Sequence, residues 1–310
     1  MSEQTPDLRV QVGPLALKNP VLAASGTFGY GREFAELFDP ALLGGVIVKG
    51  LSLKPRPGNP PPRIVETPCG MLNAIGLANV GLERFLDEKL PWLRALDTVV
   101  VVNIYGHSVS EYGELAGALR DVDGIDALEV NISCPNVEQG GMAFGTDPDA
   151  SARVTETVLA RSDKPVIVKL SPNVTDIREP ARAVERAGAH AISLINTITG
   201  MVVDVESRTP MLANVTGGLS GPAIRPVAVR MVHEVVSSVG IPVIGGGGIM
   251  TARDALEFLI TGACAVEVGT ASFVNPRATL EIVDGIRAFC RDRRIQRLRE
   301  VIGTLTFKST

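Results

Sequence analysis

The chain has 310 residues, of which 45% are hydrophobic and 21% are charged, and its formal net charge is −4. This composition is ordinary for a folded globular protein and excludes global disorder and a coiled coil. The acidic balance and an aromatic content of only 4% argue against nucleic-acid binding, either through a basic surface or through stacked bases.

The N-terminal segment carries Glu3 and Asp7 and lacks the apolar stretch of a signal peptide. No apolar run reaches the roughly 18 residues that suggest a membrane span. We therefore expect a cytoplasmic protein that does not enter a membrane. The four cysteines contain no CxxC pair, so we expect no zinc, iron–sulfur or other metal site in this chain.

Strand-like and helix-like segments alternate along the chain. Residues 8–20 predict a β-hairpin that turns at Gly13 and Pro14. Strands are then predicted at residues 21–25, 45–49, 99–104, 128–133, 166–170, 191–195, 243–245 and 265–268. Amphipathic helices are predicted at residues 83–96, 110–120, 150–160, 176–187, 223–238, 252–259 and 276–291, after a short first helix at 32–37.

This alternation predicts a (β/α)8 TIM barrel that forms a single domain over residues 1–310. Most of the strands are continuous apolar runs, as in parallel sheets covered on both faces. The alternative is a doubly wound open sheet, which would carry GxGxxG after its first strand and an acidic residue about 20 positions later. Here the first strand runs into ASGTFGYG, and no acid fits that role. We expect the hairpin to cap the bottom of the barrel.

Three predicted loops are longer than a barrel requires, at residues 52–72, 136–149 and 202–220. Long loops in compact domains are often functional. Each follows a strand, so all three should extend from the C-terminal face, where barrel enzymes have their active sites.

Polar residues gather at the predicted strand ends. Lys49 and Lys169 have the largest free-energy cost of burial among them, because an ammonium group in an apolar strand needs a partner. Two lysines at one barrel mouth imply an anionic ligand; the alternative is that they pair with core acids, for which Glu129 and Glu267 are the candidates.

Two glycine-rich loops, at residues 245–248 and 269–270, follow the last two strands and each opens a helix. Backbone N–H groups at such positions can converge on a phosphate, and this is the usual phosphate site of barrels. The alternative is that these glycines only form tight packing turns.

Cys134 directly follows the fourth strand and precedes a glycine-rich loop. A structural cysteine would more often lie inside an apolar run. A thiol at a strand exit can act as a base or nucleophile where nearby cations lower its pKa. The sequence therefore makes Cys134 the candidate catalytic residue.

Ordered motifs along nearly the whole chain resemble class 1 dihydroorotate dehydrogenases. They include ASGTFGYG (24–31), MLNAIGLAN (71–79), NISCPN (131–136), GGMAFGTDP (140–148), VKLSPN (168–173), GGLSGPAIRPVA (217–228) and IGGGGI (244–249). The resemblance implies an enzyme that oxidises dihydroorotate to orotate in pyrimidine biosynthesis, with FMN as its prosthetic group.

The resemblance also implies roles for individual residues. Cys134 would be the catalytic base. The residues that would hold FMN are Ser25, Lys49, Gly50, Asn103, Asn131, Lys169, Ile195, Gly221, Gly247, Gly248, Gly269 and Thr270. Those that would face the substrate are Lys49, Asn73, Ala74, Ile75, Gly76, Leu77, Asn131, Asn196 and Thr197.

Within class 1, the motifs look most like the B type, whose catalytic subunit passes electrons to NAD through an electron-transfer subunit that carries FAD and a [2Fe–2S] cluster. This implies a heterotetramer of two catalytic and two electron-transfer subunits. The alternatives are the fumarate-dependent A type, another FMN barrel such as dihydropyrimidine dehydrogenase, and a phosphate-binding barrel without enzymatic activity. Ala78 and Val80 stand where the family usually has glutamine and proline, which leaves the packing of this loop open.

Overall fold

The computed structural model describes residues 5–133 and 143–307. Eight parallel strands close into a barrel in the order β10-β15-β16-β3-β4-β7-β8-β9, and the predicted (β/α)8 TIM barrel is thereby confirmed. The barrel strands are β3 (Val21–Ala23), β4 (Gly45–Ile47), β7 (Val99–Ile104), β8 (Ala127–Asn131), β9 (Val166–Lys169), β10 (Ala191–Leu194), β15 (Val243–Gly246) and β16 (Ala265–Val268).

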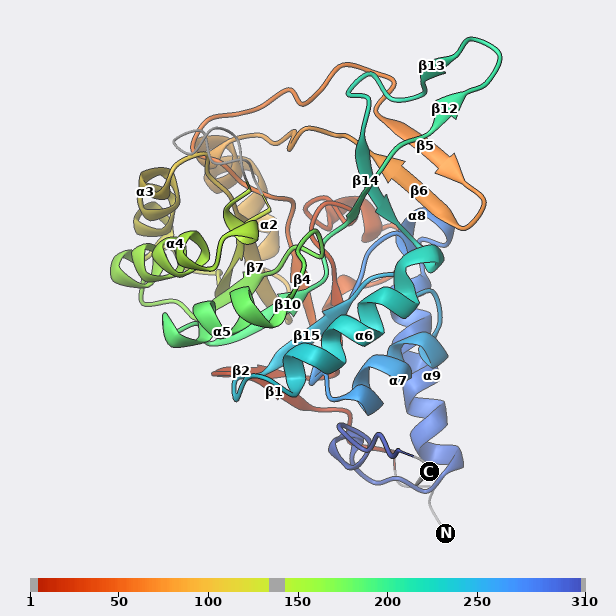
Figure 1. The fold of residues 1–310 in the computed structure, drawn as a ribbon. Helices are drawn as coiled ribbons and strands as arrows, with labels where there is room; N and C mark the ends of the chain where they lie inside the picture. The colour runs from red at the N-terminus through yellow and green to blue at the C-terminus, as the bar shows by residue number, and fades with distance from the viewer. Residues whose placement is uncertain (1–4, 134–142, 308–310) are drawn as a thin grey trace.

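Helices cover the outside of the barrel (Figure 1). They are α1 (Leu82–Arg84), α2 (Leu90–Leu93), α3 (Val109–Leu119), α4 (Pro148–Arg161), α5 (Arg178–Arg186), α6 (Arg225–Val236), α7 (Ala252–Thr261), α8 (Ala271–Val274) and α9 (Ala278–Asp292). The predicted helix at 83–96 is divided by a π-helical turn, Phe85–Lys89, and the predicted helix at 32–37 is a 3-10 turn, Arg32–Phe34. None of the described helices is both long and apolar enough to cross a membrane.

Side-chain caps fix where several of these helices begin. Ser108 accepts a hydrogen bond from the Glu111 N–H at the start of α3. Thr251 and Asp254 form a capping box at the start of α7, in which each side chain accepts from the other residue's backbone N–H. Such caps satisfy N–H groups that have no partner within the helix, and they fix the residue at which each of these two helices begins.

The N-terminal hairpin consists of β1 (Val10–Val12) and β2 (Leu15–Leu17). Its turn lies against the segment that enters β10, because a Cβ added to Gly13 would lie 2.8 Å from the His190 carbonyl oxygen. His190 directly precedes β10, so the hairpin lies at the N-terminal end of the barrel, as predicted.

A second sheet lies on the side of the barrel opposite this hairpin (Figure 1). It is antiparallel, with the order β11-β14-β6-β5, and a small hairpin, β12–β13, extends beyond it. Most of its residues come from the long loops predicted at 52–72 and 202–220, which pair with each other; β6 ends one residue beyond the first loop, and β11 precedes the second. The strands of this sheet are β5 (Ile64–Thr67), β6 (Gly70–Asn73), β11 (Ile198–Gly200) and β14 (Gly217–Ser220), and those of the small hairpin are β12 (Val203–Asp204) and β13 (Thr209–Pro210).

Candidate functional site

Three glycine-containing loops converge at the C-terminal face. A Cβ added to Gly248 would lie 2.7 Å from the Gly221 carbonyl oxygen, and one added to Gly221 would lie 3.6 Å from Cγ2 of Thr270. Gly221 and Gly248 have φ values of 97° and 77°, which only glycine adopts easily. The N–H groups of Gly247, Gly248 and Thr270 donate no hydrogen bond to the described residues. Unpaired N–H groups gathered in this way suit a phosphate.

An ion pair fixes two of these loops to each other. Arg225 begins α6, just after the Gly221 loop, and its guanidinium contacts the Asp254 carboxylate of α7. Asp254 in turn accepts from the N–H groups of Met250 and Thr251, directly after the Gly247–Gly248 loop. The pair therefore holds both loops in one arrangement. Sequence reasoning missed it, because nothing in the local pattern places Arg225 beside Asp254.

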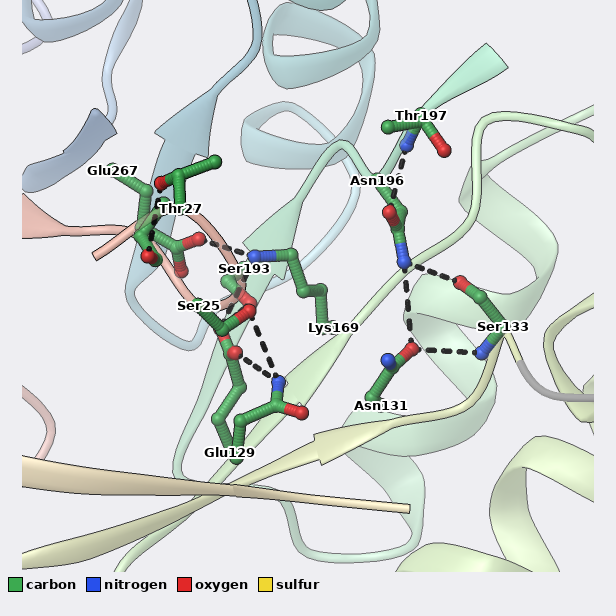
Figure 2. A network of polar contacts seen from close by, with 12 residues as sticks. Ser25, Thr27, Glu129, Asn131, Ser133, Lys169, Ser193, Asn196, Thr197 and Glu267 are labelled. Carbon is green, nitrogen blue, oxygen red and sulfur yellow. Dashed lines mark hydrogen bonds and ion pairs between the residues drawn. The ribbon is translucent and has the colours of Figure 1, made fainter. Parts of the chain in front are cut away.

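A buried charged cluster lies inside the barrel (Figure 2). The Lys169 ammonium contacts the Glu267 carboxylate directly and lies 3.6 Å from Oε1 of Glu129. Glu129 also accepts hydrogen bonds from Asn103 and, at 2.8 Å, from the Ser193 hydroxyl. For Lys169 the structure thus shows the pairing with core acids that the sequence left open. The signal was present in the sequence, since Glu129 and Glu267 are acids within apolar strands.

The two buried carboxyl groups of this cluster have pKa values shifted in opposite directions. Burial, and then the charge of Glu129, raise the pKa of Glu267 to about 8. Although burial opposes it, Lys169 holds the pKa of Glu129 below its usual value, and the two carboxylates keep the pKa of Lys169 above its usual value. Oε1 of Glu267 is buried and has no hydrogen-bond partner among the described residues, so only the other oxygen of this carboxyl group is paired. The cluster is then neutral near pH 7.

We expect the stability of the protein to fall as the pH rises from about 4.5 to about 8. In this window the folded protein keeps the proton on Glu267 while the unfolded chain has lost it, so the folded state binds more protons. In Glu267→Gln this contribution should vanish. Urea unfolding at pH 5 and pH 9 checks this: the wild type should lose more stability between the two than the variant, and equal losses would contradict the assignment.

Asn103 links this cluster to the mouth of the barrel. Its Nδ2 lies 3.4 Å from the Ser25 hydroxyl, and its Oδ1 is buried without a partner among the described residues. A Cβ added to Gly50 would lie 2.9 Å from that Oδ1. An unpaired buried acceptor beside a bare glycine is a place where a ligand hydroxyl can donate.

A set of amides lies on the other side of Lys169 (Figure 2). Nδ2 of Asn196 lies 3.0 Å from the Ser133 hydroxyl and 3.4 Å from Oδ1 of Asn131. That Oδ1 also accepts from the Ser133 N–H. Primary amides can present paired donors and acceptors to a heterocycle with amide edges. Ser133 was not among the predicted site residues, although it lies within the NISCPN motif.

Lys49 behaves differently from Lys169. Burial, and then the charge of Arg63, lower the pKa of Lys49. Its ammonium has no hydrogen bond or ion pair to any residue in the described ranges. A half-buried ammonium group without a hydrogen-bond or ion-pair partner among the described residues suits the binding of an anionic ligand.

The predicted substrate segment, residues 73–77, begins at Asn73, the last residue of β6 in the second sheet, and continues beyond the strand. Asn73 Nδ2 donates to the Gly218 carbonyl, and Thr197 lies against the same glycine, because a Cβ added to Gly218 would collide with the Thr197 side chain. Ala74, Ile75 and Gly76 continue the segment, and Leu77 ends it. The structure therefore brings Asn73 and Thr197 together from segments far apart in the sequence.

Ile195 and Gly269, two further predicted residues, lie in or beside the glycine loops. Ile195 donates its N–H to the Gly246 carbonyl, and a Cβ added to Gly247 would lie 3.2 Å from the Ile195 side chain. Gly269 immediately precedes Thr270 in the loop after β16. Cys134 lies outside the described residues. Within the described ranges, no group of three His, Cys, Asp or Glu side chains is arranged to hold a metal ion.

Comparison with known proteins decides the family. The sequence model of the dihydroorotate dehydrogenase family matches residues 7–290. The chain belongs to the dihydroorotate dehydrogenase family. It is 57% identical to a "Dihydroorotate dehydrogenase B (NAD(+)), catalytic subunit" of Geotalea uraniireducens, over 97% of this chain and 98% of the relative. Proteins of the same name from Trichlorobacter lovleyi and a Thermoanaerobacter species are 58% and 53% identical, over 97% and 96% of this chain and 99% of each relative.

These matches confirm three predictions: the family, its oxidoreductase class, and the likeness to the B type.

Proposed function

We propose that the chain oxidises dihydroorotate to orotate with FMN in pyrimidine biosynthesis, as a single FMN-binding barrel domain. The observation that carries the proposal is the arrangement of three features on one barrel face: the glycine loops suited to a phosphate, the buried Lys169, and the amides Asn131 and Asn196 beside it. This order matches a cofactor with a phosphate tail and a ring at the barrel mouth, next to a pyrimidine.

The residues present fit FMN. The N–H groups of Gly247, Gly248 and Thr270, which donate to none of the described residues, would hold the phosphate together with Gly221 and Gly269. Ser25, Gly50 and the unpaired Oδ1 of Asn103 would receive the polar chain. Lys49, Asn131, Lys169 and Ile195 would surround the ring. When bound, FMN supplies the two-electron acceptor that no side chain provides.

The chain's own residues would bind and orient the substrate. Lys49 is the half-buried cation that would hold the substrate carboxylate as a point charge. Asn73, Asn131 and Asn196 would bind the amide edges of the pyrimidine, with the rest of residues 74–77 and Thr197 around it. Cys134, from its sequence position, would take the proton from the substrate carbon.

Electrons would leave through a partner. The relatives are named catalytic subunits and carry NAD(+) in their names. We propose an electron-transfer subunit with FAD and a [2Fe–2S] cluster, two of each subunit in the complex, and a location in the cytoplasm. The support is the B-type likeness, together with the absence of any GxGxxG strand–helix motif or CxxC pair in this sequence.

The test is to purify the chain alone and together with a candidate partner. Flavin absorbance, and phosphate analysis of the released cofactor, should identify FMN. Dihydroorotate should then reduce NAD only when the partner is present. Efficient NAD reduction by the chain alone would refute the partner, efficient fumarate reduction would indicate the A type, and activity on uracil instead of dihydroorotate would indicate another FMN barrel.

Arg225→Gln should weaken the binding of FMN about tenfold and that of riboflavin less than twofold. The ion pair with Asp254 orients the two phosphate loops, and losing a charged hydrogen-bonded pair of this kind typically costs about 1.5–3 kcal/mol. Equilibrium titration of the FMN-free chain with both flavins measures the ratio. Arg230→Gln is the control, because Arg230 lies on the same helix and its ion pair among the described residues is with Glu234 at the surface. If the ratio of the FMN and riboflavin dissociation constants were the same in Arg225→Gln as in the wild type, the proposed role of Arg225 would be wrong.

A further inference from the structure

Leu77 adopts a backbone conformation that leucine normally avoids. Its φ is 59°, in the left-handed region, although leucine has no polar side chain to compensate. Such a conformation persists only where the surroundings enforce it. Leu77 ends the segment 73–77, which we propose faces the substrate.

Two buried side chains hold the Leu77 carbonyl. The Tyr105 hydroxyl donates to it at 2.9 Å, and the Asn79 amide nitrogen lies 2.9 Å from the same oxygen. Asn79 Nδ2 also lies 2.8 Å from the Tyr105 hydroxyl oxygen, so the tyrosine can accept from Asn79 while it donates to Leu77. Tyr105 is 1% exposed and Asn79 is 8% exposed, which keeps water from replacing these bonds.

Asn79 also closes the loop that carries this segment. Its backbone exchanges two hydrogen bonds of 3.0 Å with Arg56, and its Oδ1 accepts from the Gly81 N–H at 2.8 Å. The Ser52 hydroxyl lies 2.9 Å from Asn79 Nδ2 and 3.0 Å from the Tyr105 hydroxyl. The start and the end of the chain between β4 and α1 thus meet at one buried point.

Tyr105 ties that point to the barrel. It directly follows β7, and its N–H donates to the Leu51 carbonyl beyond β4. Lys49 lies two residues before Leu51, just after β4, and Asn103 lies two residues before Tyr105, near the end of β7. The position of residues 73–77 relative to Lys49 and Asn103 is therefore set through this contact.

We infer that Tyr105 and Asn79 are positioning residues for the substrate: they hold Leu77 in its left-handed conformation and so fix residues 73–77 over the barrel mouth. The inference rests on the proposed function only for what the segment binds. The anchoring itself is a property of the chain without ligand. Losing it would release a segment that ligand binding must then order again.

Tyr105→Phe in the FMN-loaded chain is the central variant. By calorimetry it should bind orotate about tenfold more weakly, with the KM for dihydroorotate raised to match and kcat changed less than threefold. In a Leu77→Gly background, Tyr105→Phe should weaken orotate binding less than threefold, because glycine adopts this φ without the Tyr105 hydrogen bond. The comparison is between Leu77→Gly and the double variant. Ser52→Ala removes a hydroxyl that touches Asn79 and Tyr105 but not Leu77, and should have a smaller effect.

Hydrogen exchange on the ligand-free chain gives a second readout. Tyr105→Phe should speed exchange within residues 74–77 and leave the barrel strands unchanged. Unchanged exchange there, or an equal loss of orotate affinity in the wild-type and Leu77→Gly backgrounds, would overturn the inference. If the wild type bound FMN but no orotate, the proposed substrate would be wrong, while the exchange data would still decide whether Tyr105 anchors the segment.

Discussion

Lys169→Met should destabilise the ligand-free protein by about 3–5 kcal/mol at pH 7, the usual cost of removing one partner from a buried ion pair. Methionine keeps the length of the side chain but not the charge. Glu129 and Glu267 would then face each other in the barrel without a cation, and both are buried. Urea unfolding measured by circular dichroism tests this expectation.

The second substitution Glu267→Gln should recover part of that loss. It removes the second buried carboxyl group and leaves Glu129 with its hydrogen bonds from Asn103 and Ser193. Lys18→Met is the control, because Lys18 pairs with the fully exposed Asp97, and an exposed pair contributes about 0–1 kcal/mol. If Lys169→Met lowered the free energy of unfolding no more than Lys18→Met does, the buried cluster would not have the stabilising role assigned to it.

The same variant also probes the proposed cofactor site. A cation near a group that becomes anionic favours its reduction. FMN bound to Lys169→Met should therefore have a lower midpoint potential than FMN bound to the wild type, by spectroelectrochemical titration. An unchanged potential would separate Lys169 from the cofactor and leave it only its structural role.

The barrel could be predicted from the sequence because its signals are local. Each strand is a short apolar run, and each amphipathic helix after it buries one face, as Val154 and Val158 do in α4. The predicted strands at 99–104 and 265–268 have the observed bounds, and the others differ by one or two residues at an end, because strands end where pairing with a neighbour stops rather than where the apolar run stops. The predicted strand at 21–25, for example, ends at Ala23.

The second sheet could not be predicted, because its signal is not local. Gly218 of β14 pairs with Asn73 of β6, across 145 positions of sequence. Glycine-rich strands such as β14 also have low intrinsic strand preference. The left-handed conformation of Leu77 is hidden for a similar reason, since only the contacts with Tyr105 and Asn79 select it.

For the candidate site, the sequence predicted which chemical groups are present better than it predicted which of them contact each other. The glycine loops and the polar strand ends follow from residue type and position. The distinction between Lys49 and Lys169 does not, because it depends on which strands are neighbours in the closed barrel. Lys169 on β9 reaches Glu267 on β16 only across the barrel interior.

Cys134→Ser should lower turnover at pH 7 by about 10²–10⁴, the contribution typical of a positioned general base. The proposal rests on the sequence position of Cys134, one residue after Ser133, whose hydroxyl lies 3.0 Å from the Asn196 amide. A serine hydroxyl is a far weaker base than a thiolate near neutral pH. Single-turnover reduction of the flavin by dihydroorotate measures the step without any partner subunit.

The pH dependence distinguishes loss of the base from loss of the site. The deprotonated fraction of a serine hydroxyl rises tenfold per pH unit, so the rate of Cys134→Ser should climb steadily up to about pH 10, whereas the wild-type rate should level off once the thiol is ionised. FMN content and orotate affinity should stay at wild-type values. Cys69→Ser, at an exposed thiol, controls for the substitution itself. A Cys134→Ser rate near that of the wild type at pH 7 would exclude Cys134 as the base, and a rate that stayed low at every pH would point to a disrupted site instead.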